Sequence, residues 1–185
     1  CGIKAGDQLT LEDLLNGLLL YSGNDNAVAI ADHIAGSTEK FAEMMNAEAK
    51  KLMATNSHFV NPSGLHDDNH YTTAYDLYLI FNECIKHDDF VKIINSSSYT
   101  AHITGADGTK RDVKWEPTNY YAKGEATPPD NVTIIGGKTG TTKGAGNCLI
   151  LLTKDSSGNP YISIIMGAGS KPLLYQDMTS MLSKI

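Results

Sequence analysis

Apolar residues recur at helical spacing through the first half of the chain. Leucines at positions 11, 14, 15, 18 and 19 lie on one face, and Thr10 precedes them as a candidate N-cap. Residues 22–25 interrupt this pattern. The same spacing predicts four more helices, which lie between Asp25 and Gly36 and over about residues 38–54, 73–86 and 89–94.

Each of these helices has an apolar face that we expect to pack against a core. The second helix places Val28, Ala31 and Ile34 on one such face. A last helix over residues 171–185 has an apolar stripe of its own. The inward residues predicted for the third helix are Phe41, Met44, Met45, Ala49 and Leu52. Those predicted for the fourth helix are Leu77, Ile80, Phe81 and Cys84, and those for the last helix are Leu174, Met178, Met181 and Leu182.

The pattern changes to strands after residue 98. Segments 99–103 and 112–115 flank a Gly-Ala-Asp-Gly turn, and segments 148–153 and 161–166 flank a Ser-Ser-Gly-Asn turn, so both pairs are predicted hairpins. A short strand over 132–135 runs into Gly136. Residues 116–131 contain three prolines and are predicted to form a long loop.

Helices come first, antiparallel strands follow, and a helix closes the chain, so we predict an α+β fold. The helical part covers about residues 8–95, and the sheet with the last helix covers about 98–185. The 185 residues, 41% of them hydrophobic, suit one globular domain. The chain begins at Cys1 rather than Met, which indicates a processed, trimmed or partial chain.

Charge and hydropathy exclude two classes of function. The net charge is -6, and the basic residues are scattered, so nucleic-acid binding is not expected. No apolar run approaches the roughly 20 residues that span a bilayer.

Cysteines and histidines predict no metal site, and no cofactor is expected. Cys1, Cys84 and Cys148 lack metal-ligand spacing, and we interpret the last two as small buried apolar residues. His66 and His70 are four positions apart, but the residues between them indicate a loop.

Two short segments contain candidate functional residues. Ser22-Gly23-Asn24 lies between two helices, and by itself it also fits an ordinary connection with Asn24 or Asp25 as N-cap. In the second segment, glycines and hydroxyls flank Lys138, which suits binding of a carboxylate or phosphate. A Gly-rich turn with a solvated lysine is the simpler alternative. The phosphate-loop pattern fails because Val132 stands where its first glycine belongs.

Together the two segments indicate a family. A Ser-x-Asn triplet between helices followed by Lys-Thr-Gly on a strand occurs in penicillin-binding proteins and class A β-lactamases. Residues 11–27, 59–65, 70–76 and 137–146 closely resemble the low-molecular-mass serine D-alanyl-D-alanine carboxypeptidases, peptidase family S11. The resemblance covers essentially the whole chain from Gly2. It implies the β-lactamase/transpeptidase-like fold, with a helical cluster packed on an antiparallel sheet.

The resemblance also implies roles for individual residues. Ser22 takes part in proton relay to the leaving amine, and Asn24 holds the substrate amide. Lys138 binds the terminal D-Ala carboxylate. Thr139 and Thr141 add hydroxyl contacts within a substrate-binding segment that includes Gly140, and the Thr141 N–H supplies half of the oxyanion hole.

One part of the family pattern does not occur. The nucleophilic Ser-x-x-Lys should precede Ser22, yet none of the first 21 residues is a serine. Ser37 and Lys40 have the right spacing but follow Ser22, and Ser37 fits a helix cap. We therefore expect that the chain is a piece of a longer enzyme, or a trimmed chain that folds by pairing with itself.

The resemblance predicts a penicillin-sensitive carboxypeptidase, of which these 185 residues alone are inactive. Its substrate is a peptidoglycan stem peptide ending in D-Ala-D-Ala, β-lactams are its inhibitors, and it acts outside the cytoplasmic membrane after export. The alternatives are a non-catalytic module that binds peptidoglycan peptides and a related β-lactamase. Self-association, or pairing with the absent N-terminal segment, is also expected.

Overall fold

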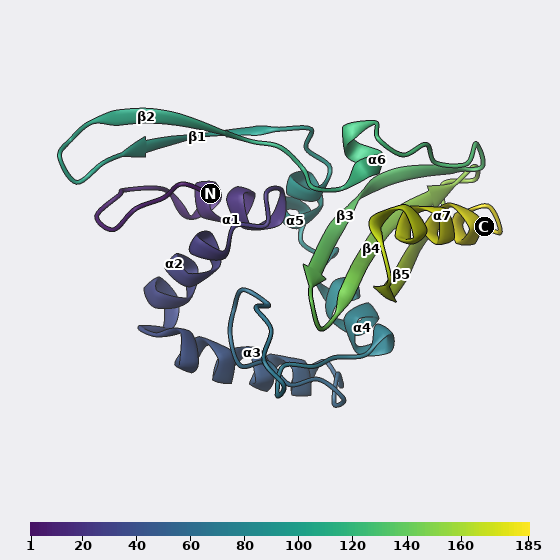
Figure 1. Ribbon diagram of the computed structural model, residues 1–185, viewed down its shortest axis with the longest axis horizontal. Helices are drawn as coiled ribbons and strands as arrows, with labels where there is room; N and C mark the ends of the chain where they lie inside the picture. Colours follow the sequence, from purple (N-terminus) through teal and green to yellow (C-terminus); the bar gives the residue numbers. More distant parts are fainter.

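The computed structural model describes residues 1–185 and contains seven helices and five strands (Figure 1). Their bounds in chain order are α1 Leu11–Leu19, α2 Asn24–Ala35, α3 Thr38–Lys51, α4 Ala74–Cys84, α5 Asp88–Ile94, β1 Tyr99–Thr104, β2 Lys110–Trp115, α6 Tyr120–Lys123, β3 Val132–Thr142, β4 Gly146–Asp155, β5 Pro160–Ala168 and α7 Lys171–Leu182. The α+β prediction is confirmed, and Figure 1 shows α2, α3 and α4 as an arc between the β1–β2 hairpin and the β3–β5 sheet.

Local capping explains where the helices begin. The Thr10 side chain accepts a hydrogen bond from the Asp13 N–H at 3.0 Å, and the Asp13 carboxylate accepts from the Thr10 N–H at 2.8 Å. This reciprocal capping box fixes the first turn of α1. Ser37 caps α3 by accepting from the Lys40 N–H at 3.2 Å, as its place in the sequence predicts.

The predicted core face of α2 is partly wrong. Ala31 is fully buried, but Val28 and Ile34 are 39% and 49% exposed. Ala27 and Ile30 are buried with Ala31 instead. In a helix of twelve residues the i, i+3, i+4 spacing fits more than one face, and the packing of α2 against α1 and α3 decides which face is buried.

The strands form two separate antiparallel sheets rather than one. β1 pairs with β2, and β3, β4 and β5 form a three-stranded sheet in that order. α7 covers the larger sheet (Figure 1). Their shared core consists of Tyr121, Val132, Leu149, Leu151, Leu174, Tyr175, Met178 and Leu182. Tyr175 thus replaces the predicted Met181, which is 38% exposed.

Two predictions for the sheet region are corrected. The strand predicted over 132–135 continues through the Lys-Thr-Gly segment to Thr142, with a register shift between Ile134 and Gly136. The loop predicted over 116–131 contains the one-turn helix α6, which Asn119 caps by accepting from the Tyr121 N–H. Tyr120 stacks on Tyr175 of α7, with ring centroids 4.6 Å apart.

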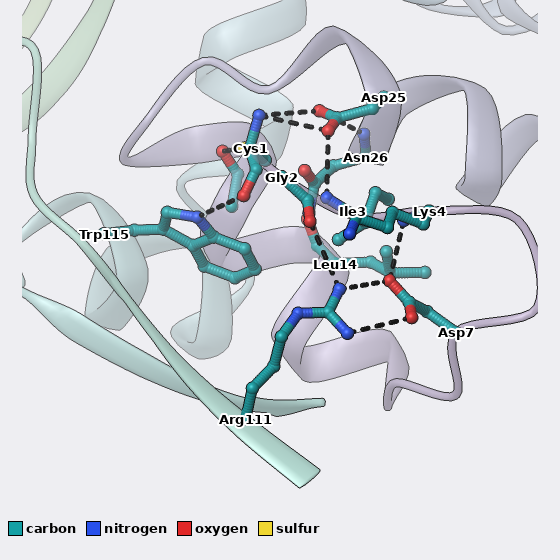
Figure 2. A network of polar contacts seen from close by, with 11 residues as sticks. Cys1, Gly2, Ile3, Lys4, Asp7, Leu14, Asp25, Asn26, Arg111 and Trp115 are labelled. Atoms are coloured by element: carbon teal, nitrogen blue, oxygen red, sulfur yellow. Dashed lines mark hydrogen bonds and ion pairs between the residues drawn. The ribbon is translucent and has the colours of Figure 1, made fainter. Parts of the chain in front are cut away.

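A polar network joins the N-terminal segment to α2 and to the β1–β2 hairpin (Figure 2). The Cys1 nitrogen lies 3.0 Å from an Asp25 oxygen, and the Trp115 indole N–H donates to the Cys1 carbonyl at 3.3 Å. Arg111 forms a two-pronged ion pair with Asp7 and lowers the pKa of its carboxyl group. Asp25 is also in α2, directly after Asn24, so this network supports the turn that contains Ser22.

No helix combines the length and the apolar character that crossing a membrane requires.

Candidate active site

Ser22 occupies a strained turn between α1 and α2. Its φ is 65°, in the left-handed region that non-glycine residues rarely adopt. The following Gly23 is buried, and its N–H donates to the Gly17 carbonyl at 3.0 Å. A Cβ at Gly23 would lie 2.0 Å from the Cys1 sulfur. A larger residue directly after Ser22 would therefore displace the side chains of Cys1 and Asn26. The turn leaves the side chain of Ser22 exposed at the surface.

The two glycines before Lys138 allow close packing of β3. A Cβ at Gly136 would lie 2.1 Å from the Ile94 carbonyl oxygen at the end of α5, and one at Gly137 would lie 2.1 Å from the Ile150 carbonyl oxygen of β4. β3 therefore lies closer to α5 and to β4 than it could if side chains were present at these two positions. This approach sets the position of Lys138 relative to the helical part.

Lys138 and Ser22 are in direct contact although 116 residues separate them. The Lys138 ammonium donates to the Ser22 hydroxyl oxygen at 2.5 Å and to the Thr139 carbonyl oxygen at 2.7 Å. Burial disfavours the charged form and lowers the pKa of Lys138 from 10.5 to about 8. No acidic side chain pairs with this ammonium in the structure, so it is available to an anionic ligand.

Ser22 and the Lys-Thr-Gly segment border one pocket of about 220 Å³. Its walls come from the α1–α2 turn, β3, β4, the start of α6 with the residues just before it, and the first half of α7. The lining residues are Ser22, Thr118, Tyr120, Thr139, Gly140, Thr141, Cys148, Lys171, Leu174 and Tyr175. A small pocket with hydroxyl groups and a cation at its edge suits a short, carboxylate-bearing ligand.

The structure brings together five of the six predicted site residues. Ser22, Thr139, Gly140 and Thr141 line the pocket, and Lys138 touches Ser22. Asn24 is the first residue of α2, and its exposed side chain is not among those that line the pocket.

Six pocket residues were not predicted to belong to the site. Cys148 and Leu174 were predicted only as buried apolar residues, and no role was predicted for the other four, Thr118, Tyr120, Lys171 and Tyr175. They come from the proline-containing segment and the start of α7, whose sequences show no pattern that relates them to Lys138.

The interpretation of Cys148 as a buried apolar residue is wrong, because it is only half-buried and lines the pocket. It pairs with Gly140 across β3 and β4, and a glycine has no side chain to cover it. Cys84 is also half-buried rather than buried.

The pKa of Lys138 predicts how anion binding depends on pH. Lys138 is charged below about pH 8 and loses its proton above that value. Binding of a carboxylate-bearing peptide should therefore be constant from pH 6 to 7 and should weaken by up to about tenfold per unit above pH 8. Isothermal titration calorimetry over pH 6–9.5 measures this. Constant affinity up to pH 9.5 would show that Lys138 does not bind the carboxylate.

The solved structures to which this chain is similar include a DD-transpeptidase and a D-alanyl-D-alanine carboxypeptidase. The Streptomyces K15 DD-transpeptidase matches with a TM-score of 0.88 and 30% identity, over 98% of this chain and 70% of that protein. A D-alanyl-D-alanine carboxypeptidase of Mycobacterium tuberculosis H37Rv matches with a TM-score of 0.82 and 28% identity, over 98% and 66%. The family model for peptidase S11, D-alanyl-D-alanine carboxypeptidase, matches residues 2–170. The chain belongs to this family, and the predicted resemblance is confirmed.

Curated relatives extend beyond the part that this chain represents. DacF of Bacillus subtilis (strain 168), a D-alanyl-D-alanine carboxypeptidase, is 30% identical over 97% of this chain and 43% of its own length. DacD of Escherichia coli (strain K12), which has the same enzyme name, is 34% identical over 91% of this chain and 40% of its own length. The chain thus spans less than half the length of these relatives.

Proposed function

We propose that residues 1–185 form the substrate-binding half of a serine D-Ala-D-Ala carboxypeptidase site. The observation that carries this proposal is the Lys138–Ser22 contact at the edge of a hydroxyl-lined pocket. It joins the two motifs of the family, which lie on different parts of the fold. A partly desolvated ammonium without an acidic partner is suited to an acceptor-only ligand such as a carboxylate.

The proposed reaction removes the terminal D-alanine from a peptidoglycan stem peptide. A serine from a Ser-x-x-Lys segment attacks the carbonyl between the two D-alanines, and the lysine of that segment takes its proton. Lys138, Thr139 and Thr141 hold the terminal carboxylate, and Asn24 holds the substrate amide. Ser22 relays a proton to the leaving amine, and the Thr141 N–H donates to the oxyanion. Water then hydrolyses the acyl-enzyme.

These roles imply penicillin sensitivity and an extracytoplasmic location. A β-lactam presents a carboxylate beside a reactive carbonyl, so the same residues would bind it and the same serine would be acylated. Peptidoglycan lies outside the cytoplasmic membrane, so the enzyme is proposed to be exported. Because no Ser-x-x-Lys precedes Ser22 among these residues, the activity proposed for residues 1–185 alone is binding without turnover.

The structure favours a carboxypeptidase over a β-lactamase. A class A β-lactamase needs a glutamate that directs water to the acyl-enzyme. The glutamates of segment 116–131 are Glu116 and Glu125, which form ion pairs with Lys114 and Lys123. Neither lines the pocket.

Pairing through β5 is proposed for residues 1–185 in isolation. β5 is an edge strand of the larger sheet, and the side chains of Tyr161 and Met166 are 38% and 37% exposed. An unpaired edge of this kind binds another strand readily. The partner would be a second copy or the family's N-terminal segment.

A pair of peptides tests the proposed binding. Residues 1–185 should bind an N-acyl-D-Ala-D-Ala peptide with a free carboxylate, and they should bind its C-terminal amide at least about tenfold more weakly, because the ion pair is lost. Calorimetric titration at pH 7 measures both affinities. Equal affinity for the acid and the amide would remove the support for a carboxylate-binding site.

A further inference from the structure

Thr118 lies where the two parts of the site meet. Its backbone N–H donates to the carbonyl of Leu20, two residues before Ser22, at 3.1 Å. Its side-chain oxygen lies 2.5 Å from the side-chain oxygen of Thr139, directly after Lys138. One residue thus hydrogen-bonds both the end of α1 and the functional strand β3.

Neighbouring residues hold Thr118 in place. Trp115, three residues earlier, is 1% exposed and donates to the Cys1 carbonyl, as Figure 2 shows. Tyr120, two residues later, stacks on Tyr175, and its backbone N–H donates to the Tyr175 hydroxyl at 2.9 Å. With an anchor on each side, the segment can present the Thr118 hydroxyl in one orientation.

We infer that Thr118 is a positioning residue that orients the Thr139 hydroxyl toward the substrate carboxylate. This inference rests on the proposed function of the pocket. A carboxylate only accepts hydrogen bonds, so Thr139 must give it its single hydroxyl proton. The Thr118 hydroxyl must then donate to Thr139, which makes a directed chain from Thr118 through Thr139 to the ligand. Such a chain polarises each hydroxyl and strengthens the final bond.

Thr118→Val and Thr118→Ser form a matched pair that isolates the hydroxyl. Valine keeps the shape of threonine and the backbone bond to Leu20 but removes the donor, whereas serine keeps the donor. The first measurement uses residues 1–185 without ligand: NMR three-bond couplings of the Thr139 methyl carbon, which report its χ1 rotamer. We expect a single rotamer in the unsubstituted chain and in Thr118→Ser, and averaged couplings in Thr118→Val.

The second measurement is a double-mutant cycle of peptide affinity. Thr118→Val should weaken binding of N-acyl-D-Ala-D-Ala about tenfold, and Thr118→Ser should restore it. In a Thr139→Val background, Thr118→Val should have no further effect, because Thr118 acts through Thr139. If the role of Thr118 were purely structural, Thr118→Val would weaken peptide binding in the Thr139→Val background as well.

Each result decides the inference. Averaged Thr139 couplings in the unsubstituted chain, or unchanged couplings in Thr118→Val, would overturn it. So would an affinity of Thr118→Val within twofold of the unsubstituted chain. If the unsubstituted chain binds no D-Ala-D-Ala peptide, the proposed function is wrong, and the ligand-free couplings still show whether Thr118 orients Thr139.

Discussion

Replacing Lys138 by methionine is expected to weaken binding of a D-Ala-D-Ala peptide by about 100-fold without lowering the melting temperature. Methionine fills a similar volume but removes the charge that we propose to pair with the carboxylate, and a charge-assisted contact of this kind is worth about 2–3 kcal/mol. Without a ligand, burial of the charged Lys138 ammonium destabilises the folded state, and the same burial lowers the pKa of Lys138 to about 8. Its ammonium therefore opposes folding below pH 8, and this penalty disappears as pH rises from 8 toward 10.5.

Lys143→Met is the matched control for this substitution. Lys143 lies on the connection between β3 and β4, five residues after Lys138, and is exposed. The same change of charge there should alter affinity by less than about twofold, since exposed charges are strongly screened. Calorimetric titration at pH 7 and thermal unfolding measure both quantities. Equal losses of affinity in the two variants would assign the effect to net charge rather than to the Lys138 site.

Gly136→Ala is expected to destabilise the fold by roughly 3 kcal/mol, which for a chain of this length lowers the melting temperature by about 10 °C. The added methyl group would lie 2.1 Å from the Ile94 carbonyl oxygen, so either α5 or β3 must move. Both are backbone elements and cannot adjust as a flexible side chain would. The displacement of β3 would also carry Lys138 away from Ser22.

Gly169→Ala is the control for the glycine substitution. Gly169 precedes α7, a Cβ there meets no atom within 4 Å, and its φ is not positive. Thermal unfolding should place this variant within about 2 °C of the unsubstituted chain. If Gly136→Ala unfolds at the same temperature as Gly169→Ala, the close approach of β3 to α5 does not limit stability.

Local rules predicted most of the secondary structure. The Thr10 and Ser37 caps, the two hairpin turns and the terminal helix depend on residues close together in sequence, and all form where predicted. β3 is the instructive exception. Its two glycines favour a break in the strand, yet β3 continues because it pairs with β4 along its whole length. The glycine at position 136 is used instead to let α5 pack directly against the backbone of β3.

The site was predictable only where a motif marks it. Ser22 and the Lys-Thr-Gly segment form a known combination, so their meeting follows from the family resemblance. Thr118 and Lys171 belong to no such combination, and they reach the pocket through packing between segments far apart in the chain. The half-buried Cys148 was missed for the same reason: its exposure depends on the glycine opposite it on β3.

The most direct test of the account is intact-mass spectrometry before and after incubation with a penicillin. Two proteins are compared: residues 1–185, and a longer protein in which a Ser-x-x-Lys segment precedes them. The account predicts a penicilloyl adduct on the longer protein and none on residues 1–185, because the binding half is present in both and the nucleophile in only one. An adduct on residues 1–185 would mean that one of their own serines is activated. No adduct on either would contradict the carboxypeptidase proposal.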